Sequence, residues 1–71
     1  MDMDTQENKL LEIYVNEEKQ IIITLRIKMD LYAVTKINLK TKKMREYYFD
    51  NKNQALKKYE KMVGKNKNVE M

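Results

Sequence analysis

The segment KTKKMREYYF, residues 40–49, places four basic side chains within six positions and then three aromatic ones. Lysine and arginine neutralise phosphate groups, and aromatic rings stack on unpaired bases, so the segment could bind nucleic acid. The alternative is an ordinary lysine-rich turn that leads into a strand. We interpret Tyr47 and Phe49 as core residues, and we assign the possible binding role to the basic turn, which contains Lys40, Lys42, Lys43 and Arg45.

A second group of candidate residues lies on the strands that flank this turn. If even-numbered side chains of neighbouring strands share one sheet face, cations and phenol rings alternate there. Such a face suits single-stranded nucleic acid, because its bases stack on the rings and the cations neutralise its phosphates. The alternative is a solvated face, in which tyrosine favours the strand and lysine protects its edge. With the turn included, the predicted nucleic-acid-binding residues are Arg26, Lys28, Tyr32, Lys36, Lys40, Lys42, Lys43, Arg45 and Tyr48.

The residue types argue against catalysis. The chain has no Cys and no His, which removes thiolate nucleophiles, imidazole acid–base chemistry and the usual zinc ligands. A glycine-rich phosphate loop is excluded because there is one Gly. The carboxylates come singly, without a second group at a spacing that would form a catalytic pair. We therefore expect a protein that is not an enzyme and has no cofactor and no metal site.

The charge is unevenly distributed along the chain. Residues 1–18 hold six acidic residues and one lysine, a net charge of −5, whereas residues 19–71 carry +9. A basic body attracts anionic partners without specifying which one, and it also favours solubility. The acidic segment is interpreted as a solvated tail, with competition for the anion site as the alternative.

A helix is predicted after residue 51, with clear signals at both ends. Asp50 or Asn51 can cap its first turn, and Gly64 suits a left-handed residue just after its last turn. Its apolar stripe comprises Ala55, Leu56, Tyr59, Met62 and Val63. The basic face, which comprises Lys52, Lys57, Lys58, Lys61 and Lys65, is interpreted as an ordinary solvated surface.

Four strands are predicted at residues 10–15, 20–29, 31–39 and 44–49. Alternation is clearest in the second strand, where Ile21, Ile23 and Leu25 share one face. We expect odd-numbered residues to face the core on every strand, which requires turns of three or five residues at 16–19 and 40–43. Residues 28–30 lack turn chemistry, so the second and third segments form either a tight hairpin or one bent strand.

These elements predict an α+β fold, a four-stranded antiparallel meander (ββββα) with one C-terminal helix packed on one sheet face. The domain is expected to span residues 9–64, between a flexible acidic tail at 1–8 and a flexible polar tail at 65–71. A twelve-residue helix is about 18 Å long and a ten-residue strand about 33 Å. Because the helix is too short to cover the sheet, we expect a homodimer.

Residues 32–62 resemble, in the order of their elements, the N-terminal arm-binding domains of tyrosine recombinases. In that family a basic strand pair precedes a phenylalanine, a short cap and an alanine-containing helix, which correspond here to Phe49, Asp50 and Ala55. The ββββα order is also similar to that of dimeric single-strand-binding transcription cofactors. Neither resemblance assigns a site residue.

The sequence therefore predicts a small binding module that contacts nucleic acid through the phosphate backbone. The second hypothesis is a protein-binding inhibitor or adaptor, such as a phage counter-defence protein acting on a host protein. The Lys, Asn, Ile and Glu content is typical of a low-GC bacterium, its phages or its plasmids. No apolar run approaches the roughly 20 residues that cross a bilayer, so we expect a cytoplasmic protein without a membrane partner.

Overall fold

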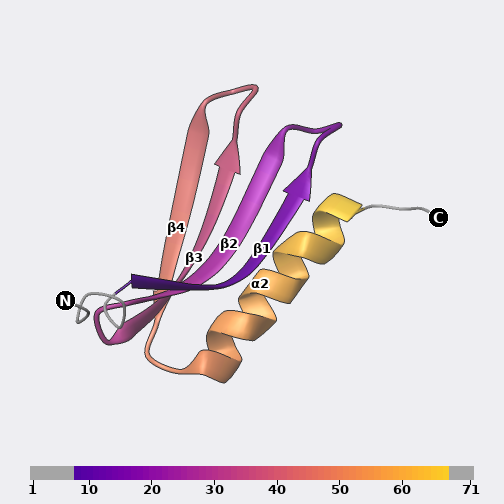
Figure 1. Cartoon of the computed structure of the whole chain (residues 1–71). Helices are drawn as coiled ribbons and strands as arrows, with labels where there is room; N and C mark the ends of the chain where they lie inside the picture. The colour runs from indigo at the N-terminus through magenta and orange to yellow at the C-terminus, as the bar shows by residue number, and fades with distance from the viewer. Residues whose placement is uncertain (1–7, 68–71) are drawn as a thin grey trace.

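The computed structural model describes residues 8–67, which form one antiparallel sheet and one helix (Figure 1). The strands are β1 (Asn8–Asn16), β2 (Ile21–Lys28), β3 (Leu31–Asn38) and β4 (Lys43–Phe49), in the spatial order β1-β2-β3-β4. The helix α2 (Lys52–Lys67) packs on one face of the sheet. The predicted ββββα meander is confirmed. Most of the two predicted tails, residues 1–7 and 68–71, lies outside the described residues.

The connections between strands have even lengths, which corrects the predicted turns of three or five residues. Asn16 pairs with Ile21 and Asn38 pairs with Lys43, so each of these turns holds four residues. The second and third strands form a tight hairpin, in which only Met29 and Asp30 lie between paired residues. Of the two predicted alternatives, the tight hairpin is therefore correct and the single bent strand is wrong.

Asparagine side chains stabilise both four-residue turns. The Oδ1 atom of Asn16 accepts a hydrogen bond from the Lys19 N–H at 3.0 Å. The Oδ1 atom of Asn38 accepts bonds from the N–H groups of Lys40 and Thr41 at 3.0 and 3.1 Å. Such side-chain bonds allow asparagine to begin a turn without the Asn-Gly pair of a two-residue hairpin.

Even turn lengths change which residues face the helix on each strand. Across such a turn, an odd-numbered residue always pairs with an even-numbered one, so the inward set alternates from strand to strand. The odd residues of β2 and β4 face α2 as predicted, but on β3, and on β1 from Glu12 to Asn16, the even residues do so. An irregularity between Leu10 and Glu12 shifts the β1 register and allows Leu11 to pack against the core.

The core lies between α2 and the helix-facing side of the sheet. Its buried members come from the two central strands and the helix, and they are Ile21, Ile23, Leu25, Val34, Ala55, Tyr59 and Met62. The predicted helical stripe is confirmed, since Leu56 and Val63 pack against this cluster as well. Ile13 and Val15, which were predicted to be buried, lie on the opposite face and are more than half exposed, at 54% and 52%.

Helix α2 begins where the sequence predicts and ends later. The Oδ1 atom of Asn51 accepts hydrogen bonds from the N–H groups of Asn53 and Gln54, so Asn51 is the N-cap. The helix then continues through Gly64 to Lys67. Its last turn is held by Asn66, whose side chain donates to the Met62 carbonyl and whose own carbonyl accepts a bond from Asn16. This tertiary contact explains why Gly64 does not end the helix.

Candidate functional site

The nine predicted binding residues do not share one face of the sheet. Arg26, Lys28 and Tyr48 lie on the face without the helix, which we call the open face. Tyr32, Lys36, Lys43 and Arg45 lie on the helix-facing side, and Lys40 and Lys42 belong to the turn between β3 and β4. The prediction that the even-numbered strand residues Arg26, Lys28, Tyr32, Lys36 and Tyr48 share one face was wrong, because the alternation of inward residues reverses at each even-length turn.

The helix-facing side brings together cations from the sheet and the helix. One hollow of about 230 Å³ lies beside the β3–β4 turn and is lined by Lys36, Asn38, Thr41, Lys43 and Arg45. A second hollow, of about 340 Å³, lies between β4 and α2 and is lined by Lys36, Arg45, Tyr47, Lys58, Met62, Lys65 and Asn66. Lys36 and Arg45 line both hollows. We call Lys36, Lys43, Arg45, Lys58 and Lys65 the basic cluster.

The strand register and the helical repeat place these five side chains side by side. Lys36 pairs with Arg45 across the two strands, and Lys43 pairs with Asn38 nearer the turn. Lys58 and Lys65 are seven positions apart in α2, so they lie on the same side of the helix two turns apart. The cluster therefore combines strand residues with helix residues that are separated by more than a dozen positions in the sequence.

Tyr47 lies among the cations of the cluster, and they affect its ionisation. Its pKa is lowered by a hydrogen bond from Arg45, and the charges of Lys58, Arg45 and Lys36 act in the same direction against partial desolvation. The Lys58 Nζ atom also lies 4.3 Å from the centre of the Tyr47 ring. That distance allows a cation–π interaction, which holds the ammonium group at the edge of the hollow.

The cluster lacks the carboxylates that would neutralise it. Neither hollow is lined by Asp or Glu. Within residues 8–67, the ion pair that the structure shows joins Lys28 to Glu46, on the open face. Five cations around two hollows with shared lining residues can bind an anion with several charged groups, since each cation neutralises one of them.

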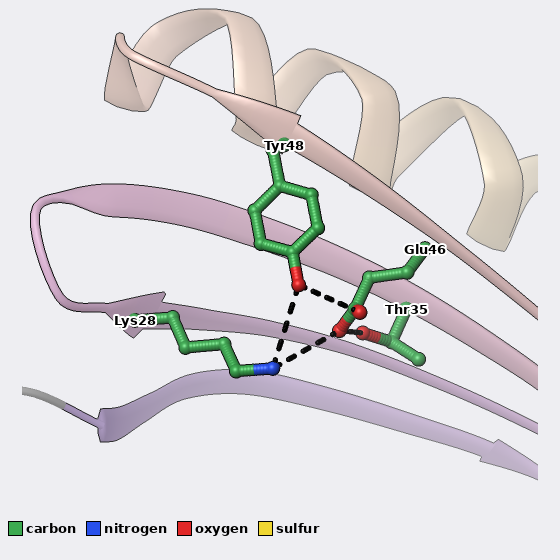
Figure 2. A network of polar contacts seen from close by, with 4 residues as sticks. All are labelled: Lys28, Thr35, Glu46 and Tyr48. Atoms are coloured by element: carbon green, nitrogen blue, oxygen red, sulfur yellow. Dashed lines mark hydrogen bonds and ion pairs between the residues drawn. The ribbon is translucent and has the colours of Figure 1, made fainter.

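On the open face, two of the predicted binding residues, Lys28 and Tyr48, already bind Glu46 (Figure 2). Tyr48 donates a hydrogen bond to Glu46 at 2.8 Å, and Thr35 donates to the same carboxylate at 3.0 Å. The Lys28 Nζ atom lies 3.7 Å from Glu46 and 3.4 Å from the Tyr48 hydroxyl. Hydrogen bonds from Tyr48 and Thr35, together with the charge of Lys28, lower the pKa of Glu46 despite its partial burial. Lys28 and Tyr48 thus form an internal network rather than a free cationic surface.

Sequence reasoning missed Lys58 and Lys65 as members of the site. Both stood among the basic helix residues that were interpreted as solvated surface. A signal was present in their spacing, because Lys58 and Lys65 flank Met62 of the apolar stripe, at four and three positions from it. Such positions border the packed face of a helix and point toward the adjoining strand, whereas Lys57 and Lys61 are fully on the exposed side.

The arrangement offers binding chemistry, and the described residues offer no metal site. Within residues 8–67, no group of three or more His, Cys, Asp or Glu side chains is placed to hold a metal ion. In the same part of the chain, no helix is long and apolar enough to span a membrane. Comparisons with protein-family models, curated proteins and solved structures found no match to this chain. The resemblances drawn from the sequence therefore remain resemblances of element order.

Proposed function

We propose that this protein is a non-enzymatic nucleic-acid-binding module that holds the phosphate backbone in the basic cluster. The observation that carries the proposal is the meeting of five cations around two hollows that share Lys36 and Arg45 and have no lining carboxylate. Phosphates are regularly spaced along a nucleic acid, so a strand presents several charges to such a surface at once. A single small anion would use only part of it.

The composition of the cluster favours contacts to the backbone over contacts to base edges. Four of its five cations are lysines, which act as mobile point charges. It has one arginine, Arg45, so at most one side chain of the cluster offers the planar fork that suits a bidentate contact with guanine. We therefore expect binding that depends strongly on salt and weakly on sequence.

The test compares two double variants that remove the same charge from different places. Lys36→Gln with Arg45→Gln neutralises the centre of the cluster, and Lys57→Gln with Lys61→Gln neutralises the exposed side of α2. Affinity for a fluorescent random-sequence oligonucleotide is measured by anisotropy between 50 and 200 mM salt. We expect the first variant to lose at least about tenfold in affinity and to reduce the log–log salt slope by about two.

The control decides between a site and a general attraction. If both double variants lose the same affinity, the protein binds through its net charge and the basic cluster has no special role. If the wild-type protein binds no oligonucleotide at 50 mM salt, the proposal is wrong. Circular dichroism of each variant shows whether a loss of binding reflects a loss of fold.

A protein-binding inhibitor or adaptor is the second candidate, and a separate observation favours it. The open face carries exposed apolar side chains, including Ile13 and Met44, which charged phosphates do not require. Recovery of one stoichiometric partner protein by the wild type, together with no oligonucleotide binding at low salt, would support this candidate. Because the two surfaces lie on opposite sides of the sheet, variants of one leave the other intact.

A further inference from the structure

The open face of the sheet carries one continuous line of apolar residues. Val15 pairs with Ile22, Ile22 with Ile37, and Ile37 with Met44, so these four residues form a row across all four strands. Val15 and Met44, at the two ends, are 52% and 62% exposed, and Ile22 and Ile37 are half-buried between them. Within residues 8–67, no helix or strand covers this row (Figure 1). We call these four residues the apolar row.

The strand residues of the open face carry a net charge of +1, from Arg26, Lys28 and Glu46. Glu46 lies in the next row along β4 and pairs with Lys28, while Arg26 adds one further cation on this face. The basic cluster and the lysines of α2 lie on the other side of the sheet. A surface with little net charge can meet an identical surface without strong repulsion, even though the whole chain carries a net charge of +4.

We propose that two copies of this chain pack open face to open face, with the apolar row of each copy against that of the other. A two-fold axis parallel to the strands, between β2 and β3, places Ile22 opposite Ile37 of the second copy. The same axis places Val15 opposite Met44 of the second copy. Each contact therefore occurs twice, as a two-fold interface requires.

The size of the face agrees with what a second copy needs. Four strands about 4.8 Å apart and eight residues of about 3.3 Å each give a face of roughly 500 Å². Two such faces together remove roughly 1,000 Å² from water, which reaches the lower limit for a specific protein–protein interface. Sheets that pack in this way stand about 10 Å apart, so side chains of the two rows interdigitate directly.

This dimer does not depend on the proposed nucleic-acid binding. Face-to-face packing turns both helices outward, so the two basic clusters lie on the outer surfaces and remain accessible. The dimer then presents two phosphate-binding surfaces on opposite sides. Loss of the dimer and loss of oligonucleotide binding are therefore separate outcomes, each with its own variants.

The first test measures the oligomeric state by sedimentation equilibrium between 5 and 200 µM. Met44→Glu places a charge in the row, and Met29→Glu makes the same change at a 70% exposed residue of the β2–β3 turn. We expect the wild type and Met29→Glu to dimerise, and Met44→Glu to raise the dissociation constant at least about tenfold, because an unpaired charge is costly to bury. A wild type that stays monomeric at 200 µM overturns the proposal, as does a Met44→Glu variant that dimerises like the wild type.

A second test locates the contact, and it uses the fact that the chain contains no cysteine. Val15→Cys and Met44→Cys variants are mixed and oxidised, and the disulfide-linked species are separated by mass. The rate at which the disulfide between Cys at position 15 and Cys at position 44 forms is compared with the rate for a Met29→Cys control. A faster rate for the first pair supports contact between the apolar rows of the two copies. Equal rates for the row and the control would mean that the copies meet at random, which would overturn the interface.

Discussion

Lys36 and Arg45 are direct partners across β3 and β4, so two cations stand opposite each other on the helix-facing side of the sheet. Like charges in that relationship destabilise a sheet by a few tenths of a kcal/mol to about 1 kcal/mol. The arrangement becomes favourable when an anion binds between them. It therefore links the stability of the free protein to the proposed function.

Replacing Lys36 by Glu is expected to stabilise the free protein and weaken nucleic-acid binding. The new carboxylate opposes Arg45 with the opposite charge, which should add about 0.5–1 kcal/mol to the free energy of unfolding at low salt. Urea denaturation measures the gain, and anisotropy measures the loss of affinity. Lys40→Glu, in the exposed β3–β4 turn, makes the same charge change without a paired cation and should show no such gain. A destabilised Lys36→Glu variant would contradict the assumed repulsion.

Acid should destabilise this protein partly through Glu46. The pKa of Glu46 is lowered in the folded state, chiefly by hydrogen bonds from Tyr48 and Thr35. A carboxyl with a lowered folded pKa stabilises the protein above its unfolded pKa, about 4.3, and this stabilisation is lost as the pH falls through the folded pKa. Glu46→Gln should therefore flatten the decline of thermal stability between about pH 5 and pH 3. Glu60→Gln, an exposed control on α2, should retain the wild-type decline; identical profiles for all three proteins would exclude this role.

Gly64→Ala should stabilise the protein. Gly64 lies inside α2, and a Cβ atom at this position meets no heavy atom within 4 Å. Alanine favours a helix interior over glycine by about 0.8–1.0 kcal/mol. The free energy of unfolding from urea denaturation should rise by about that amount, and Gly64→Thr, which is β-branched, should gain less. No gain from alanine would indicate that the last turn of α2 does not form in solution.

The β2–β3 hairpin contains a strained residue that glycine should relieve. Met29 has φ of 59°, a left-handed value that side chains with a Cβ atom seldom adopt. Met29→Gly should raise the free energy of unfolding by about 0.5–1 kcal/mol, since the relieved strain exceeds the entropy cost of glycine. Met29→Ala keeps the Cβ atom and should give no gain. Equal effects of the two substitutions would place the stabilisation in the loss of the long side chain instead.

The sequence determined the elements of this fold because local signals specify them. Alternating isoleucines indicated β2. The Asn51 cap and the apolar stripe from Ala55 to Val63 indicated α2. With four strands before one helix, a meander was the simplest topology. The absence of Cys and His was also visible, because it depends on composition alone. These inferences needed no knowledge of how one strand meets the next.

Only the tertiary structure decided which side chains share a face. Side chains alternate with a period of two along a strand, so a turn longer or shorter by one residue exchanges the two faces of every strand that follows. The turns that begin at Asn16 and Asn38 hold four residues each. Because of this length, Lys36 lies on the helix-facing side opposite Arg45, and Val15 and Ile37 lie on the open face. The hydrogen bond between Asn16 and Asn66 likewise stabilises the last turn of α2, so the helix continues beyond Gly64. The apolar row depends on the register of all four strands, and the basic cluster depends in addition on the packing of α2 beside β4.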